Sequence, residues 1–96
     1  MAYQVILSPT AENDLDGIVA YVARDNAAAG ERFGLELLDA ALALAELPRR
    51  GRLFRRNRGI RRIVHGNYLI VYRLNEAEKT VEILRFWHAA RGEPRF

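Results

Sequence analysis

The hydrophobic residues of the chain follow two different periods near its start. Tyr3, Val5 and Leu7 occupy every second position of residues 3–7, and this alternation predicts a short β-strand. From residue 8 onward the apolar spacing changes to three and four, which predicts a helix of about four turns with one buried stripe. The stripe consists of Ala11, Leu15, Ile18, Val19 and Val22.

Capping signals mark the ends of this helix and the start of another. Ser8 can cap the first helix, and Pro9 sacrifices no hydrogen bond at the first helical position. Asn26, after a break in the apolar pattern, offers a cap for a second helix. We expect that helix to cover residues 27–47, because Pro48 cannot continue it.

The second predicted helix has two apolar stripes side by side, although a small domain needs only one for its core. One stripe is Phe33, Leu37, Ala41 and Leu44, and the other is Leu35, Leu38, Leu42 and Ala45. The second stripe either extends a broad contact with the sheet and the first helix or forms a surface that binds another protein.

The rest of the chain is rich in β-branched and aromatic residues and predicts three strands. These are residues 59–65, 68–74 and 80–87. Gly66-Asn67 suits a two-residue hairpin turn, residues 75–79 form a second turn, and the tail, residues 88–96, is expected to be coil. The predicted fold is α+β with the order β-α-α-β-β-β, in which an N-terminal strand and a two-helix hairpin pack on an antiparallel sheet.

The length of 96 residues corresponds to one domain, residues 1–96. Cysteine is absent, which excludes disulfides and a thiolate nucleophile and favours a reducing, cytoplasmic location. We expect no membrane partner and no signal peptide, because no apolar stretch approaches the roughly 20 residues of a membrane span. Two histidines without cysteine are too few for a zinc site, so no metal and no cofactor are expected.

Charge is distributed unevenly along the chain. Residues 1–46 contain eight acidic and two basic residues, whereas residues 47–96 contain thirteen basic and four acidic residues. Eight arginines fall within residues 49–62, with no acidic residue among them. This cluster is either a solvated loop or a surface for an anionic partner, such as nucleic acid or an acidic protein segment.

Several segments resemble one known group of proteins when they are read in order. Leu-Ser-Pro at residues 7–9 opens the first helix, and residues 60–63 lead into the strand of residues 68–73. Residues 81–92 end their strand in His88, with Arg91 three positions later. This order is similar to that of the ParE/RelE superfamily, the toxins of bacterial type II toxin–antitoxin systems.

The resemblance implies one of two targets. RelE-like members cut messenger RNA on the ribosome, ParE-like members poison DNA gyrase, and an antitoxin holds both kinds inactive. Several ribonuclease members have an arginine directly after the position of Tyr68, where this chain has Leu69. This difference favours the ParE-like branch, growth arrest and a role in plasmid stabilization. A ribosome-dependent endoribonuclease and an inactive member that only binds its partner remain the alternatives.

The resemblance places the target-binding surface at the end of the last strand. Its candidates are Arg85, Trp87, His88 and Arg91. No catalytic residue is assigned, but a ribonuclease would use His88, Arg61 and Arg85. His88 is alternatively a strand-end hydrogen-bonding residue, and Trp87 a core residue. Arg85 shares a face with Val81, Ile83 and Trp87 by strand alternation, where it is either paired internally or functional.

The antitoxin, expected to be ParD-like and encoded by an adjacent gene, is predicted to bind as an amphipathic, acidic peptide. Apolar anchors would contact the second helix, and carboxylates would pair with the arginine cluster. The predicted antitoxin-binding residues are Phe33, Leu35, Leu38, Leu42, Arg55, Arg56 and Arg58.

Overall fold

The computed structural model describes residues 2–55 and 59–95, except for the side chains of Phe54 and Arg55. In chain order the elements are β1 (Gln4–Leu7), α1 (Pro9–Ala23), α2 (Ala27–Leu42), the 3-10 turn η1 (Ala43–Ala45), β2 (Arg52–Arg55), β3 (Ile60–His65), β4 (Tyr68–Asn75), β5 (Thr80–His88) and the 3-10 turn η3 (Ala89–Arg91). None of the described helices is long and apolar enough to cross a membrane.

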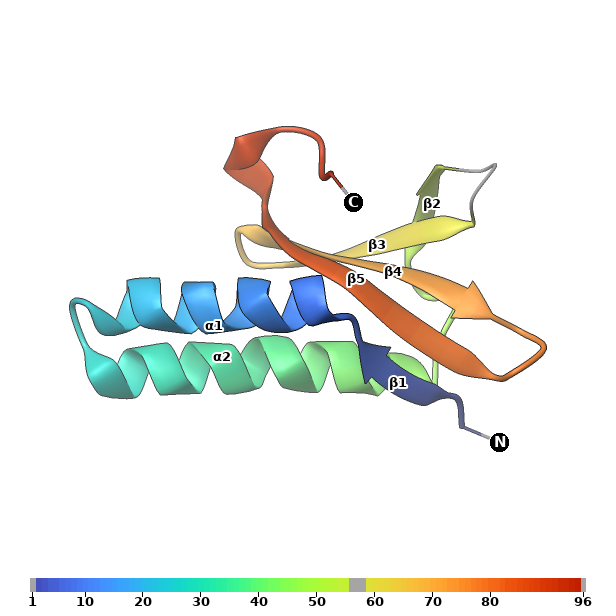
Figure 1. Ribbon diagram of the computed structural model, residues 1–96, viewed down its shortest axis with the longest axis horizontal. Coiled ribbons are helices and arrows are strands. Elements are labelled where there is room, and N and C mark those ends of the chain that lie inside the picture. Colours follow the sequence, from blue (N-terminus) through green and yellow to red (C-terminus); the bar gives the residue numbers. More distant parts are fainter. Residues whose placement is uncertain (1, 56–58, 96) are drawn as a thin grey trace.

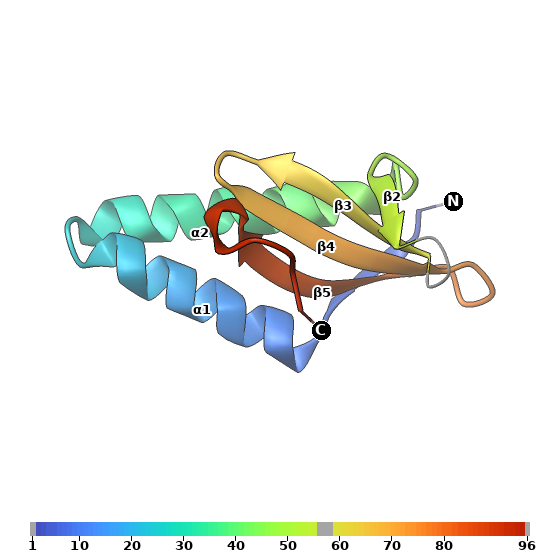
Figure 2. The ribbon, with the colours of Figure 1, turned by 90° about the horizontal axis from the view of Figure 1, so that it is seen from above.

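The elements form two layers (Figure 1). One layer is a sheet with the strand order β1-β5-β4-β3-β2. The other is the antiparallel pair α1 and α2, which covers one face of the sheet, while the C-terminal tail runs over the opposite face (Figure 2). We call that opposite side the helix-free face. The predicted α+β fold, with a helix pair laid on a sheet, is confirmed.

The sheet differs from the prediction at both of its edges. It is mixed rather than wholly antiparallel, because β1 pairs in parallel with β5, Val5 lying opposite Val81. At the other edge, β2 lies within the arginine cluster, where no strand was predicted, and Arg52 lies opposite Arg62. Charged edge strands lack the apolar alternation of central strands, so the sequence pattern did not reveal β2.

Both predicted helix caps are present, and one helix end differs. The Ser8 hydroxyl accepts a hydrogen bond from the Ala11 amide at 3.0 Å, and the Asn26 side chain accepts one from the Ala29 amide at 3.0 Å. The α-helical part of the second helix ends at Leu42 and tightens into η1, five residues before the predicted end at residue 47. A final 3-10 turn is a common way to satisfy the last carbonyl groups of a helix.

The core lies between the helices and the sheet. The first stripe of α2 enters it, because Leu37, Ala41 and Leu44 are fully buried and Phe33 is partly buried. Half of the second stripe faces outward instead, with Leu35 53% and Leu42 46% exposed, while Leu38 and Ala45 are partly buried. Leu35 and Leu42 are therefore available for contact with another protein, rather than being used in a broader contact with the sheet and the first helix.

A smaller apolar cluster lies on the helix-free face. It consists of Ile60, Leu69, Val71 and Trp87, with Leu84 packed beside them. The tail covers this cluster rather than running as free coil, because Pro94 is buried and the Trp87 indole Nε1–H donates a hydrogen bond to the Gly92 carbonyl at 3.0 Å.

A β-bulge in β5 corrects the predicted face of Arg85. Val71 lies opposite Arg85, but Tyr72 lies opposite Ile83, so Leu84 is an extra residue in β5. Because one extra residue reverses the alternation of a strand, Ile83 packs in the helix-side core. Trp87 and its neighbour Arg85 therefore do not share the face of Val81 and Ile83.

Candidate functional site

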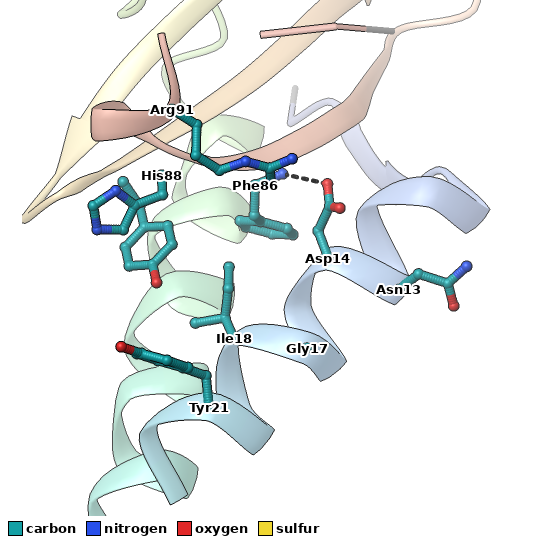
Figure 3. A pocket seen from close by; sticks show the side chains of 9 residues that line it. Asn13, Asp14, Gly17, Ile18, Tyr21, Phe86, His88 and Arg91 are labelled. Atoms are coloured by element: carbon teal, nitrogen blue, oxygen red, sulfur yellow. Dashed lines mark hydrogen bonds between the residues drawn. The ribbon is translucent and has the colours of Figure 1, made fainter. Parts of the chain in front are cut away.

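A pocket of about 450 Å³ opens between α1 and the end of the sheet (Figure 3). Its lining combines apolar and aromatic side chains with a few polar ones. The residues are Asn13, Asp14, Gly17, Ile18, Tyr21, Tyr68, Phe86, His88 and Arg91. Two of the four predicted target-binding residues, His88 and Arg91, thus lie at one pocket, which we call the strand-end pocket.

Asp14 of α1 and Arg85 of β5 form an ion pair beside this pocket. The Asp14 carboxylate accepts hydrogen bonds from Arg85 Nε at 2.7 Å and Nη2 at 2.9 Å. The side chains are only 14% and 16% exposed, respectively. The hydrogen bond to Asp14 raises the pKa of Arg85 above its ordinary value. Of the two roles open to Arg85, the geometry is that of an internal pair.

Trp87 is nearly buried and has two guanidinium groups over its ring. The guanidinium carbon of Arg85 lies 4.8 Å from the ring centroid, and that of Arg91 lies 4.2 Å from it. At these distances cation–π attraction holds each cation against the indole. Arg91 is itself exposed, so Trp87 acts as a buried support for a cation at the surface.

His88 occupies the end of β5 in the way expected of a strand-end residue. Its Nδ1 accepts a hydrogen bond from the Ala90 amide at 3.1 Å, which caps η3. Its ring meets that of Tyr68 edge-on, with centroids 4.9 Å apart. Burial raises the pKa of Tyr68 above its ordinary value, so this phenol stays protonated at neutral pH.

The structure separates Arg61 from His88, the proton-exchanging residue of the ribonuclease alternative. The Arg61 guanidinium donates hydrogen bonds to the Arg49 carbonyl at 3.4 Å and the Gly51 carbonyl at 2.8 Å. His88 pairs with Tyr68 of β4, and Tyr68 in turn pairs with His65 at the other end of β3. Four residues of strand separate Arg61 from that end, roughly 13 Å along β3. Leu69, compared above with an arginine of several ribonucleases, belongs to the apolar cluster of the helix-free face.

Seven of the nine residues that line the strand-end pocket were not predicted as site residues, and three of these are polar residues of α1. Asp14, Asn13 and Tyr21 belong to α1, and their positions on the polar side of its apolar stripe gave no signal beyond a solvated helix face. Arg85, a strand arginine that needs an acidic partner, was the only signal in the sequence that pointed toward Asp14. It could not identify which of the twelve acidic residues forms the pair.

A second pocket, of about 480 Å³, lies between α1 and α2. We call it the outer groove. Its lining residues are Leu15, Asp16, Val19, Ala27, Glu31, Gly34, Leu35 and Leu38. Two of the predicted antitoxin-binding leucines, Leu35 and Leu38, thus line one groove, and Leu42 is exposed farther along α2.

Of the remaining predicted antitoxin-binding residues, Phe33 is not part of this lining. Phe33 packs against Tyr68, with ring centroids 5.5 Å apart, at the sheet side of α2. Arg55 belongs to β2, but its side chain is not among those described, and Arg56 and Arg58 lie outside the described residues. No group of three or more potential metal ligands is found in the part of the chain that the structure describes.

Comparison with known proteins gives consistent matches. The family model described as "ParE toxin of type II toxin-antitoxin system, parDE" matches residues 5–92. A solved structure of the toxin–antitoxin complex RelBE2 from Mycobacterium tuberculosis matches with a TM-score of 0.72 and 27% identity, covering 92% of this chain and 99% of that one.

A second solved structure bears on the fold alone. It is the chromosomal ParDE TA system from P. aeruginosa, with a TM-score of 0.76 and 15% identity, covering 91% of this chain and 96% of that one. None of the curated protein sequences matches the chain. Because the family model spans nearly the whole chain, the protein belongs to the ParE toxin family, within the ParE/RelE superfamily of type II toxin–antitoxin toxins.

Proposed function

We propose that this toxin arrests growth by binding DNA gyrase, and that the surface around Arg91 makes the contact. The observation that carries the proposal is the arrangement at Trp87, which holds the exposed Arg91 guanidinium 4.2 Å from its ring centroid. A pre-positioned cation loses little conformational entropy when it binds a target surface that is anionic, or partly anionic and partly apolar. Gyrase lies in the cytoplasm, so the toxin would act there, and a plasmid carrying the pair would be stably inherited.

The neighbouring side chains support binding rather than acid–base chemistry. Arg85 is paired with Asp14, the Nδ1 atom of His88 is engaged by the tail, and Tyr68 has a raised pKa. A ribonuclease needs a group that exchanges protons near neutral pH and a cation on the phosphate. Arg61, the cation of that alternative, is held by carbonyl groups beside β2.

Two substitutions separate the binding mechanism from a ribonuclease. Arg91→Ala removes the exposed cation, and we expect it to raise the toxin concentration that inhibits gyrase about ten- to hundredfold, as the loss of a charged contact does. His88→Gln keeps size and polarity and should retain most of the activity. The measurements are induction in a bacterium, trapped cleaved plasmid DNA, and mapping of messenger RNA ends.

The opposite pattern would refute the gyrase proposal. If a folded His88→Gln protein loses all activity, Arg91→Ala keeps it, and codon-positioned cuts accumulate in messenger RNA, the protein is a ribosome-dependent endoribonuclease. If induction changes neither DNA nor RNA, the chain is an inactive member of the family that only binds its partner.

We also propose that a ParD-like antitoxin from an adjacent gene lays an apolar helix in the outer groove. Leu35 and Leu38 line the groove, and Leu35 is 53% exposed, which suits helix-in-groove recognition. Asp16 and Glu31 lie in the same lining, so the docked helix should have basic flanks. Its acidic segment would instead reach the arginines near β2 and β3.

Leu35→Glu tests the outer groove. Because the side chain is half exposed, the fold should tolerate the charge, whereas a docked apolar helix would bury it without a partner. We expect antitoxin affinity to fall about tenfold or more, measured by titration calorimetry. Val64→Glu is the matched control, since Val64 is 67% exposed on the helix-free face. Equal affinity for both variants would show that the antitoxin binds elsewhere.

A further inference from the structure

Around its bulge, β5 is attached at three residues to α1 and to Ser8, the N-cap of that helix. The Ser8 amide donates to the Ile83 carbonyl at 3.0 Å, and the Ser8 hydroxyl donates to the Leu84 carbonyl at 3.2 Å. Further along, the Asp14 carboxylate accepts the Phe86 amide hydrogen at 3.1 Å, the bond drawn in Figure 3. A bulge interrupts ladder hydrogen bonding, and here Ser8 and Asp14 supply partners.

Asp14 also immobilises the arginine that lies over Trp87. Its two carboxylate oxygens accept from Arg85 Nε and Nη2, and one of them accepts from Phe86 as well. The remaining Arg85 nitrogen, Nη1, donates to the Arg95 carbonyl of the tail at 2.7 Å. A fork-like pair of this kind sets the guanidinium plane as well as its position.

A series of contacts through Trp87 then links Arg85 to the exposed Arg91 guanidinium. The Arg85 guanidinium lies over Trp87, the Trp87 indole donates to the Gly92 carbonyl of the tail, and Arg91 lies over the same ring. Each of these distances is below 5 Å, so displacement of Arg85 would loosen both the Trp87 ring and the tail.

We propose that Asp14 is the positioning residue of the gyrase-directed surface: through Arg85 it holds Trp87 and the tail so that Arg91 faces the target. This inference rests on the proposed function, which supplies the role of Arg91. Asp14 lines the strand-end pocket, whereas the outer groove is lined by its neighbours Leu15 and Asp16. Toxicity and antitoxin binding therefore depend on opposite sides of α1.

Asp14→Asn tests this role because an amide replaces one acceptor oxygen with a donor, which faces the donors of Arg85 or Phe86. We expect Trp87, the sole tryptophan, to show red-shifted emission and stronger acrylamide quenching. The concentration needed to inhibit gyrase should rise about ten- to hundredfold. Helix content by circular dichroism should be unchanged, and antitoxin affinity should stay within about twofold.

Three further variants make the result decisive. Asp14→Glu keeps the carboxylate and should restore part of the activity, and Arg85→Lys, which keeps the charge but loses the fork, should resemble Asp14→Asn. Glu12→Gln removes an exposed acid from the same helix and should leave fluorescence and activity unchanged.

Two results would overturn the proposal. Normal Trp87 emission and normal inhibition in Asp14→Asn would show that the tail is held without Asp14. Loss of helix content and antitoxin binding together, in both Asp14→Asn and Arg85→Lys, would make the pair a general stabiliser of the fold. Failure of the gyrase assignment has a different signature, because Arg91→Ala would then keep its activity while the Trp87 emission still responded to Asp14→Asn.

Discussion

Replacing Trp87 by alanine is expected to destabilise the protein by about 3–5 kcal/mol, as removal of a large buried aromatic side chain does. The side chain is 2% exposed and packs with Ile60, Leu69 and Val71 on the helix-free face. Its loss leaves a cavity below the tail and removes the surface on which Arg85 and Arg91 lie. The midpoint of urea unfolding measures the effect.

Trp87→Phe is the control for this prediction. A phenyl ring keeps most of the apolar contact but cannot donate to the Gly92 carbonyl, so we expect a loss of only about 1–2 kcal/mol. Growth arrest should fall with Trp87→Ala and persist in part with Trp87→Phe. If Trp87→Ala unfolds at the wild-type urea concentration, the cluster on the helix-free face contributes nothing to stability, and the tail is not held by it.

Replacing Gly30 by valine is expected to have the second largest effect, about 3 kcal/mol of destabilisation. A Cβ atom at Gly30 would lie 2.8 Å from the Val19 carbonyl oxygen and 2.9 Å from the Ala23 amide nitrogen. Both contacts are with backbone atoms, so α1 and α2 must move apart to admit the side chain. Antitoxin affinity should fall as well, because the outer groove lies between these helices.

Gly17→Ala is the matched control in α1. A Cβ atom there meets nothing within 4 Å, and alanine stabilises a helix interior by about 0.5–1 kcal/mol relative to glycine. The two substitutions should therefore shift the melting temperature in opposite directions. Equal destabilisation by both would mean that the close approach of the helices at Gly30 is not what the substitution disturbs.

Much of the fold could be predicted from local patterns. The period of the apolar residues located both helices and four of the strands, and Ser8 and Asn26 cap the helices as expected. Gly66 has φ 60° at the hairpin turn between β3 and β4, where such turns require a positive φ. These features depend on residues close together in sequence, so their signals survive without tertiary information.

The arrangement of the edges could not be predicted in the same way. Nothing in residues 4–7 indicates that β1 lies beside β5 in parallel, because its pairing partner is more than seventy residues away. β2 is recognisable only through its pairing with β3. Its arginines lack the apolar alternation by which a strand is identified.

The candidate site was also predicted only in part from the sequence. Its position at the end of the last strand, with Trp87, His88 and Arg91, followed from the resemblance of residues 81–92 to the family. The roles within it did not, because the bulge at Leu84 decides which face Arg85 occupies. Asp14, 71 residues before Arg85 in the chain, decides that this arginine is paired internally.

The sequence by itself thus determined the two helices with their caps, four of the five strands and the family, since short-range periodicity and motif order carry that information. It also predicted the region of the site. Only the tertiary structure decided the mixed sheet, the outward direction of Leu35 and Leu42, the covering tail and the ion pair of Asp14 with Arg85. Each of these depends on a contact between distant residues, and its free energy exists only once both partners have been brought together by the folded chain.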